Sequence, residues 1–346
     1  MAFYMQYLIF CVLSWQANQN IGFFISNLKN IINSGFGLQF RIGCSGWSYT
    51  SWTGPFYPLN LENSDWLRFY SQIFDYVEID STFYRIPNEF MVKNWAKRTP
   101  DNFRFTAKFP KVITHDKQLV DIENEVDLFL DNMEPLQEKT LALLIQLPPS
   151  LEIVPGLEGL RNLLPLLNDR FRYAVEVRHH SWFQDLAYNF FAYNNFCMVW
   201  SQLARIRTPP IVTSDFLYIR FIGDRSIDEK DFGKIQKDRV FEMNKWARGI
   251  KEVESGNGRG KNKEVGLAMI AANNHYAGFG PGTANLFRKM VGLSELSWEN
   301  QQQIQKQLQL RQQQQKEKQD QQVSNSRIVS KKQIKNRQSS LSEFID

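Results

Sequence analysis

The amino-acid sequence predicts a single (β/α)8 barrel, also called a TIM barrel, over residues 39–294. The chain has 346 residues with 43% hydrophobic content, which is enough to fill a barrel of about 250 residues and leave both ends over. From residue 39, apolar segments with strand character alternate with helical periodicity, as repeated βα units require. After residue 294 the composition changes to Gln-rich polar sequence, so the predicted domain ends there.

The alternating apolar and helical segments predict eight strands and seven helices. The strands are expected at residues 39–44, 76–79, 104–108, 141–146, 172–177, 196–200, 216–221 and 265–271. The helices are expected at residues 65–74, 89–97, 122–138, 157–167, 185–194, 239–253 and 281–291. Eight parallel strands close a barrel with no open edge, and each is followed by helical or loop sequence that leads to the next.

The two ends of the chain differ from the predicted barrel. Residues 1–38 form an apolar extension whose status is open: the run from Tyr7 to Trp15 is too short to span a bilayer of about 30 Å, and no Lys or Arg precedes it, so a membrane anchor is the weaker reading. Residues 295–337 are expected to be a disordered, low-complexity Gln/Lys-rich linker, with a coiled coil as the rival reading.

Charge and cysteine content limit the partners and the cell compartment that are expected for the protein. The net charge is +5, but from Glu299 onward nine Lys or Arg face five Asp or Glu, so the predicted barrel is nearly neutral. A neutral body argues against strong non-specific binding to nucleic acid, although a local basic patch would escape this count. The three cysteines are widely spaced, which fits a reducing, cytoplasmic setting and no disulfide framework.

Polar residues follow the predicted strands, where a barrel places its catalytic groups. Glu78 and Glu176 each end an apolar strand, and two carboxylates in one cleft can divide acid and base roles. His179 follows Glu176 and is expected to join them in proton transfer. The alternative is that each carboxylate belongs to a structural ion-pair network with Lys108, Arg178 or Arg220.

The remaining strand ends predict a substrate site. Cationic groups there suit phosphate or carboxylate, and aromatic faces beside them suit a nucleobase or a sugar ring, unless the aromatics only pack the loops. The residues expected to bind substrate are Ser45, Trp47, Asp80, Ser81, Tyr84, Lys108, Gln146, Arg178, Arg220, Asn273, Asn274 and His275. No cofactor is predicted. His115, His179 and His275 lack metal-site spacing, so a divalent metal is kept only as an alternative.

Six ordered segments carry a family resemblance. They read "GCSGWSYTSWTGPFYP", "VEIDSTFYRIP", "FRFTAKFPKVITHDK", "LLIQLPPSL", "YAVEVRHHSWF" and "NNHYAGFGPGTANLF". Together they resemble the signature blocks of the YecE-like family, also called domain of unknown function 72, from about Arg41 to Leu293. The resemblance implies a TIM barrel. That family's barrel is compared with endonuclease IV-like and sugar-isomerase-like barrels, an analogy of fold and not of chemistry.

The last nine residues, 338–346, resemble a short interaction motif. Gln338, Leu341, Phe344 and Ile345 fit the spacing of the peptide that binds the PCNA-type sliding clamp. The resemblance implies a helical turn whose apolar side chains fill a pocket on the clamp. The alternative is that these side chains fold back on the barrel.

These observations give three hypotheses of function. The leading one is an enzyme of nucleic-acid metabolism, a nuclease-like hydrolase acting on a phosphate-bearing substrate, recruited to a sliding clamp and in contact with DNA. The second is an enzyme acting on a sugar or sugar phosphate. The third is a non-catalytic binding or adaptor barrel. The sequence does not predict the oligomeric state.

Overall fold

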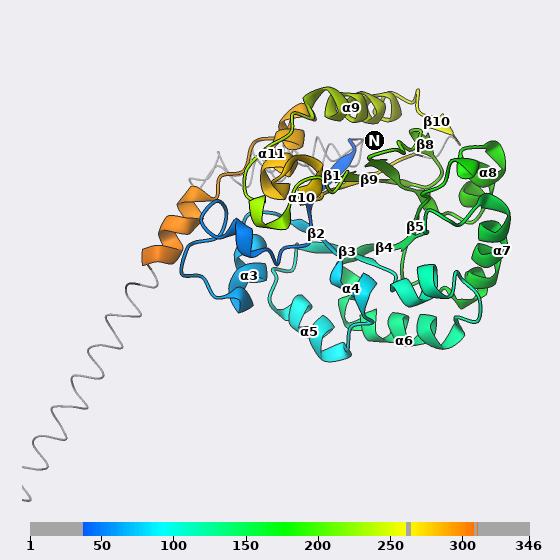
Figure 1. Cartoon of the computed structure of the whole chain (residues 1–346), viewed down its shortest axis with the longest axis horizontal. Coiled ribbons are helices and arrows are strands. Elements are labelled where there is room, and N and C mark those ends of the chain that lie inside the picture. Colours follow the sequence, from blue (N-terminus) through cyan, green and yellow to red (C-terminus); the bar gives the residue numbers. More distant parts are fainter. Residues whose placement is uncertain (1–36, 261–263, 308–309, 311–346) are drawn as a thin grey trace, which may run out of the picture.

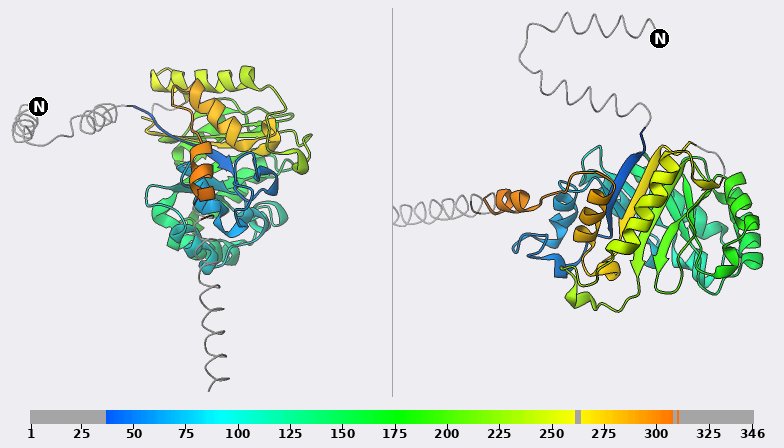
Figure 2. Two further views of the ribbon diagram at one scale, coloured as in Figure 1. Left: turned by 90° about the vertical axis from the view of Figure 1, so that its left-hand side faces the viewer. Right: turned by 90° about the horizontal axis from the view of Figure 1, so that it is seen from above.

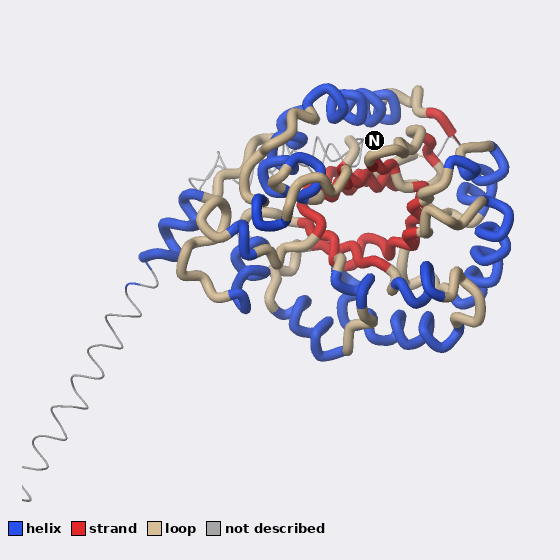
Figure 3. The backbone as a smooth tube through the Cα atoms, viewed as in Figure 1, coloured by secondary structure: helices blue, strands red, loops and turns tan. Residues whose placement is uncertain are grey.

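The structure is a computed structural model that describes residues 37–260, 264–307 and 310, and its centre is a parallel sheet curved into a nearly closed barrel (Figures 1 and 3). Nine strands form the sheet in the order β6-β5-β4-β3-β2-β1-β11-β9-β7. Their bounds are β1 (Gln39–Ser45), β2 (Tyr76–Ile79), β3 (Arg104–Lys108), β4 (Thr140–Gln146), β5 (Tyr173–Glu176), β6 (Cys197–Met198), β7 (Trp200–Leu203), β9 (Phe216–Gly223) and β11 (Leu267–Ala272). Two short strands, β8 (Ile211–Val212) and β10 (Arg259–Gly260), pair separately.

The two edges of the sheet meet at one residue. β6 pairs with β5 and β7 pairs with β9, and only Val199 separates β6 from β7 in the chain. The Val199 amide still donates to the Val175 carbonyl oxygen at 2.9 Å, so the interruption is local. Each of the eight predicted strand ranges overlaps a strand of this sheet. The range predicted at 196–200 is the one that the structure splits.

Helices surround the barrel on its outside (Figure 1). They are α3 (Trp66–Tyr70), α4 (Ser81–Tyr84), α5 (Glu89–Lys97), α6 (Glu123–Met133), α7 (Ile153–Leu163), α8 (Asp185–Tyr193), α9 (Val240–Glu254), α10 (Asn274–Ala277) and α11 (Gly280–Met290). Short helical turns add η1 (Thr50–Trp52), η2 (Asn63–Asp65), η3 (Val112–Asp116), η4 (Glu134–Lys139), η5 (Leu164–Leu166), η6 (His180–Trp182) and η7 (Glu229–Asp231). The side views of Figure 2 show α9 and α11 running along the strands. None of the described helices combines the length and apolarity needed to cross a membrane.

Two apolar layers hold this arrangement together, because successive residues of a strand face opposite sides of the sheet. One layer lies between the strands and the helices and includes Ile42, Val77, Phe105 and Ile219. The other fills the barrel interior and is smaller. Its buried members are Tyr76, Ala142, Leu144, Ala174, Cys197, Val199, Phe216, Tyr218, Leu267, Met269 and Ala271. The interior is therefore a packed core and not a pore.

The chain continues beyond α11 and packs on the loop after β1. The Trp298 indole donates to the Pro55 carbonyl oxygen at 2.9 Å and meets the Phe56 ring edge-on at a centroid distance of 5.4 Å. The Gln302 amide donates to the Phe56 carbonyl oxygen at 2.9 Å. Residues 299–307 are helical. The first part of the segment expected to be linker thus contacts the barrel, whereas residues 1–36 and 338–346 lie outside the described residues.

We expect Trp298→Ala to lower the free energy of unfolding by about 2 kcal/mol, with a fall in Tm of roughly 5 °C. The reason is the loss of a half-buried aromatic packed on Phe56 and Phe279. Differential scanning calorimetry of the full chain measures the shift. Ile304→Ala is the matched control, because Ile304 is exposed, and it should leave Tm almost unchanged. Equal Tm values for both variants would contradict the packing role.

Candidate active site

A ring of polar side chains closes the barrel interior at the carboxyl ends of the strands. Every second residue of a strand faces the barrel interior. These inward-facing residues are apolar deeper in the barrel and polar at this end. Its members are Ser45, Glu78, Lys108, Gln146, Glu176, Ser201, Arg220 and Asn273. Some neighbours in the ring are partners in the sheet register: Ser45 with Glu78, Gln146 with Glu176, and Ser201 with Arg220. Seven of these eight were predicted from sequence as part of the substrate site or as acid/base groups, and Ser201 was not among the predicted site residues.

Arg220 stands at the centre of the ring and joins the two glutamates. Its Nε lies 2.7 Å from Glu78 Oε2 and its Nη2 lies 2.8 Å from Glu78 Oε1, a bidentate ion pair. Its Nη1 donates to Glu176 Oε2. Arg220 is only 1% exposed, and both glutamate side chains are fully buried. A bidentate pair of this kind fixes the planar guanidinium in one orientation.

Two further cations flank the centre and are partly exposed. Arg178 Nε donates to Glu176 Oε1 at 2.6 Å, and Arg178 Nη2 donates to Gln146 Oε1 at 2.8 Å. Lys108 Nζ lies 3.7 Å from Glu78 Oε1. The Arg178 and Lys108 side chains are 15% and 12% exposed. Three cations and two carboxylates therefore make the direct contacts of the cluster, and the Asp80 carboxyl group lies close enough to interact electrostatically with Lys108.

Hydroxyl groups complete the environment of Glu78. Ser45 Oγ donates to Glu78 Oε1, and the Tyr218 hydroxyl donates to Glu78 Oε2. Behind Tyr218, Thr106 Oγ1 lies 2.7 Å from its hydroxyl and 2.8 Å from the Tyr76 hydroxyl. Because an ionised carboxylate only accepts, the chain donates in one direction, from Tyr76 through Thr106 and Tyr218 to Glu78. Sequence reasoning missed this chain, although its members lie two residues from Lys108, Arg220 and Glu78 in their strands.

Both glutamates are held in the ionised form. Burial alone would raise the pKa of Glu78, but Arg220 and Lys108 outweigh it and lower the pKa to about 2. Glu176 has a lowered pKa for the same reason, with Arg220 and Arg178 overcoming its burial. Each carboxylate oxygen accepts at least one hydrogen bond from the cluster. This arrangement is better suited to orienting cations than to releasing or receiving protons.

The other predicted residues lie around the cluster. Asp80 follows β2, is half-buried and accepts a 3.5 Å hydrogen bond from the Tyr49 hydroxyl; burial raises its pKa. Ser81 is exposed at the start of α4, and Tyr84 at its end is 70% exposed. His179 Nδ1 lies 2.8 Å from Ser181 Oγ, an interaction that orients the ring at the rim.

Several predicted residues have contacts that hold loops in place. Trp47 meets the Trp95 ring edge-on, at 6.1 Å. Asn273 Oδ1 accepts from the His275 amide and so caps α10. Asn274 Oδ1 accepts from the Trp52 indole at 3.0 Å and from the Gly280 amide at 2.8 Å. His275 Nδ1 lies 3.1 Å from the Ile227 carbonyl oxygen. These contacts fix the loops above the strands, and none of them joins the Arg220 cluster.

Metal ligation was the alternative reading of the histidines. Within residues 37–260, 264–307 and 310, no three or more His, Cys, Asp or Glu side chains come together in a group that could hold a metal ion. His115 instead packs edge-on against Phe83, and His275 against Phe232, both at 4.9 Å.

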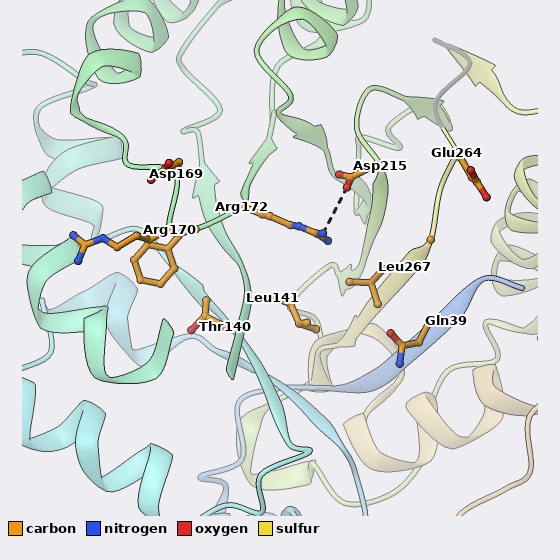
Figure 4. A pocket seen from close by; sticks show the side chains of 11 residues that line it. Gln39, Thr140, Leu141, Asp169, Arg170, Arg172, Asp215, Glu264 and Leu267 are labelled. Carbon is orange, nitrogen blue, oxygen red and sulfur yellow. Dashed lines mark ion pairs between the residues drawn. The ribbon is translucent and has the colours of Figure 1, made fainter. Parts of the chain in front are cut away.

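A separate pocket lies at the opposite end of the barrel (Figure 4). Its lining comes from the beginnings of strands, including Gln39, Thr140, Arg172 and Leu267, and from Asp215 before β9. Arg172 and Asp215 form an ion pair of 3.6 Å across it. Because barrel chemistry is carried by the loops at the carboxyl ends, this pocket is not part of the candidate site.

Comparison with known proteins agrees with this architecture. The family described as "Protein of unknown function DUF72" matches residues 41–310. The "UPF0759 protein YecE" of Escherichia coli K12 is 34% identical over 142 residues, which are 41% of this chain and 49% of YecE. The "UPF0759 protein YunF" of Bacillus subtilis is 30% identical over 149 residues, 41% of this chain and 51% of YunF. The matched region thus spans about half the length of these curated relatives.

Crystal structures of two relatives show the same fold. A DUF72 family protein of Thermotoga maritima superposes with a TM-score of 0.62 at 27% identity, covering 73% of this chain and 99% of that one. A DUF72 family protein of Enterococcus faecalis gives a TM-score of 0.59 at 23% identity, covering 75% and 100%. With its parallel α/β barrel and a family match over residues 41–310, the chain belongs to the DUF72 family.

Proposed function

We propose that this protein is an enzyme that acts on a phosphate-bearing substrate at the barrel mouth, as a nuclease-like hydrolase. The observation that carries the proposal is the outer pair of cations, Lys108 and Arg178, whose side chains stay partly exposed while buried glutamates hold them in place. A guanidinium and an ammonium on one rim suit a phosphate group.

In this proposal the central ion pairs position the phosphate-binding groups. Arg220 is buried between Glu78 and Glu176, so it supplies positive potential and rigidity without reaching the surface. His179, oriented by Ser181 and next to Arg178 in the chain, is the proposed proton-transfer group. The ion pairs support a positioning role for the two glutamates over the acid/base role that the sequence predicts.

The experiment is an activity screen of the full chain on end-labelled oligonucleotides, single-stranded, duplex and damaged, with and without divalent metal. We expect cleavage that Arg178→Ala reduces at least tenfold. Glu176→Gln is also expected to lower turnover more than tenfold. The dependence of turnover on pH separates the two roles of Glu176: loss of the acidic limb identifies a base, and an unchanged profile identifies a positioning group. Wild-type turnover in both variants would contradict the assignment of this site.

The proposal also includes the number of strand positions in the barrel and the location of the protein in the cell. We propose that β6 and β7 occupy one strand position interrupted at Val199, which makes the barrel eightfold. We also propose a cytoplasmic location, because Cys44 and Cys197 are buried free thiols, as a reducing compartment allows.

Recruitment to a PCNA-type sliding clamp through Gln338, Leu341, Phe344 and Ile345 is likewise proposed, and it would bring the barrel to DNA. Calorimetry of the full chain with the clamp is expected to give a Kd of about 1 μM or tighter, abolished by Phe344→Ala and by a chain ending at Leu310. Ending the chain at Leu310 keeps the contacts of Trp298 and Gln302 with the barrel. Binding that survives Phe344→Ala would exclude the motif as the contact.

A second candidate function is an enzyme of sugar phosphates. The hydroxyl group of Ser45 and the amide group of Gln146, beside the Arg220 cluster, favour it, since such groups recognise sugar hydroxyls. A barrel that binds these ligands without turnover would be an adaptor.

A further inference from the structure

The short helix α4 is fixed on the end of the neighbouring strand. It follows β2 directly, and Thr82 Oγ1 donates to the Lys108 carbonyl oxygen at 2.8 Å. Thr82 is only 1% exposed, so this contact is protected from water. This hydrogen bond places Phe83 and Tyr84, the last residues of α4, beside Lys108, which is one of the two outer cations.

Phe83 connects the cationic cluster with the rim. The Lys108 ammonium lies over the Phe83 ring, 5.9 Å from its centroid. His115 meets the same ring edge-on at 4.9 Å, and Tyr84 meets it at 5.4 Å with an interplanar angle of 86°. Burial and the nearby Arg178 lower the pKa of His115, so its imidazole is neutral at neutral pH and offers one donor and one acceptor. An aromatic and imidazole surface thus adjoins the phosphate-binding side of the cluster.

Tyr84 differs from the other aromatic residues around the mouth in being largely exposed. The Trp52, Trp182 and Tyr276 side chains are fully buried. Trp52 and Trp182 donate their indole N–H groups to Asn274 and to Leu151, so they hold loops together. Tyr84 keeps 70% of its surface in solvent, although it is fixed to Phe83 on a short, anchored helix. A large aromatic side chain at the rim of a polar site is a natural surface for stacking.

We infer that the mouth binds a nucleotide whose base is unpaired, with the phosphate between Lys108 and Arg178 and the base stacked on the exposed ring of Tyr84, which packs edge-on against Phe83. The inference rests on the proposed phosphate site and adds that the ligand must also carry a nucleobase. Stacking needs an exposed base face, which a base in an intact duplex does not offer, so single-stranded or flipped-out nucleotides are the class of ligand. His115 would face the edge of the base.

The test is calorimetry of the full chain with four probes: inorganic phosphate, ribose 5-phosphate, adenosine 5′-monophosphate and thymidine 5′-monophosphate. Stacking of a base on an aromatic side chain predicts that both nucleotides bind about 5- to 100-fold more tightly than ribose 5-phosphate. Tyr84→Ala should reduce nucleotide affinity toward that of ribose 5-phosphate and leave ribose 5-phosphate binding unchanged. Tyr84→Phe should retain the preference, because the ring and not the hydroxyl provides the stacking.

Tyr193→Ala is the matched control, since Tyr193 is an exposed tyrosine at the end of α8 and should change none of the four affinities. Equal affinities for ribose 5-phosphate and the nucleotides would overturn the inference and leave the phosphate site standing. Failure of all four probes to bind would overturn both the inference and the proposed function. A nucleotide preference that persists in Tyr84→Ala would also overturn it, because the base would then be recognised elsewhere.

Discussion

Arg220→Met is expected to lower the free energy of unfolding by about 3–5 kcal/mol at neutral pH. The substitution leaves Glu78 and Glu176 fully buried without their central cation. An uncompensated buried carboxylate is costly because the surrounding protein solvates its charge far less well than water does. Urea denaturation of the full chain at pH 7 measures the loss. Arg172→Met is the control: Arg172 pairs with Asp215 at 3.6 Å while both are about half exposed, and its loss should cost less than about 1 kcal/mol.

The cause of that loss can be separated from a simple packing defect. Combining Arg220→Met with Glu78→Gln and Glu176→Gln removes the stranded charges, so the triple variant should regain stability relative to Arg220→Met alone. Without Arg220, burial would raise the pKa values of both carboxyls, and the penalty in the single variant should shrink as pH falls through the raised values. A stability of Arg220→Met within about 1 kcal/mol of the original chain would show that the central ion pairs carry little of the fold's stability.

The barrel was predictable because its pattern is local. Each strand is a short apolar run between helical stretches, and the eight predicted ranges all overlap strands of the sheet. The split at Val199 was not predictable, because residues 196–200 read as one apolar run, and only pairing with two different neighbours interrupts it.

The members of the site were predictable, but their contacts were not. Glu78, Glu176 and Arg220 lie at or near the carboxyl ends of apolar strands, and that position identified them. Which carboxylate meets which cation depends on the register of strands 142 residues apart in the chain, as for Arg220 and Glu78. The hydroxyl chain through Tyr218 could have been found by reading strand residues two positions before the polar ring. The packing of Trp298 on the barrel had no local signal, because polar Gln-rich sequence surrounds it.

Acidification should reveal how strongly the cluster favours the ionised form of Glu78. The pKa of Glu78 is lowered from 4.5 to about 2 in the folded chain, mainly because Arg220 and Lys108 outweigh its burial. A lowered folded-state pKa stabilises the protein fully above pH 4.5, and this contribution is lost as pH falls from about 4.5 toward 2. The loss for Glu78 alone is about 3 kcal/mol, and Glu176, whose pKa is also lowered, adds to it.

Urea denaturation at a series of pH values between 6 and 3 measures this dependence. Glu78→Gln should be less stable than the original chain at pH 6, yet its stability should fall less steeply below pH 4.5, because the group that takes up the proton is gone. Asp65→Asn is the matched control. Asp65 pairs with Arg68 at 3.7 Å on the surface, where solvent weakens the interaction, so its removal should change the pH dependence much less. Parallel curves for Glu78→Gln and the original chain would mean that Glu78 does not carry the acid sensitivity, and the ion pairs with Arg220 and Lys108 would then be too weak to hold the outer cations in place for a phosphate.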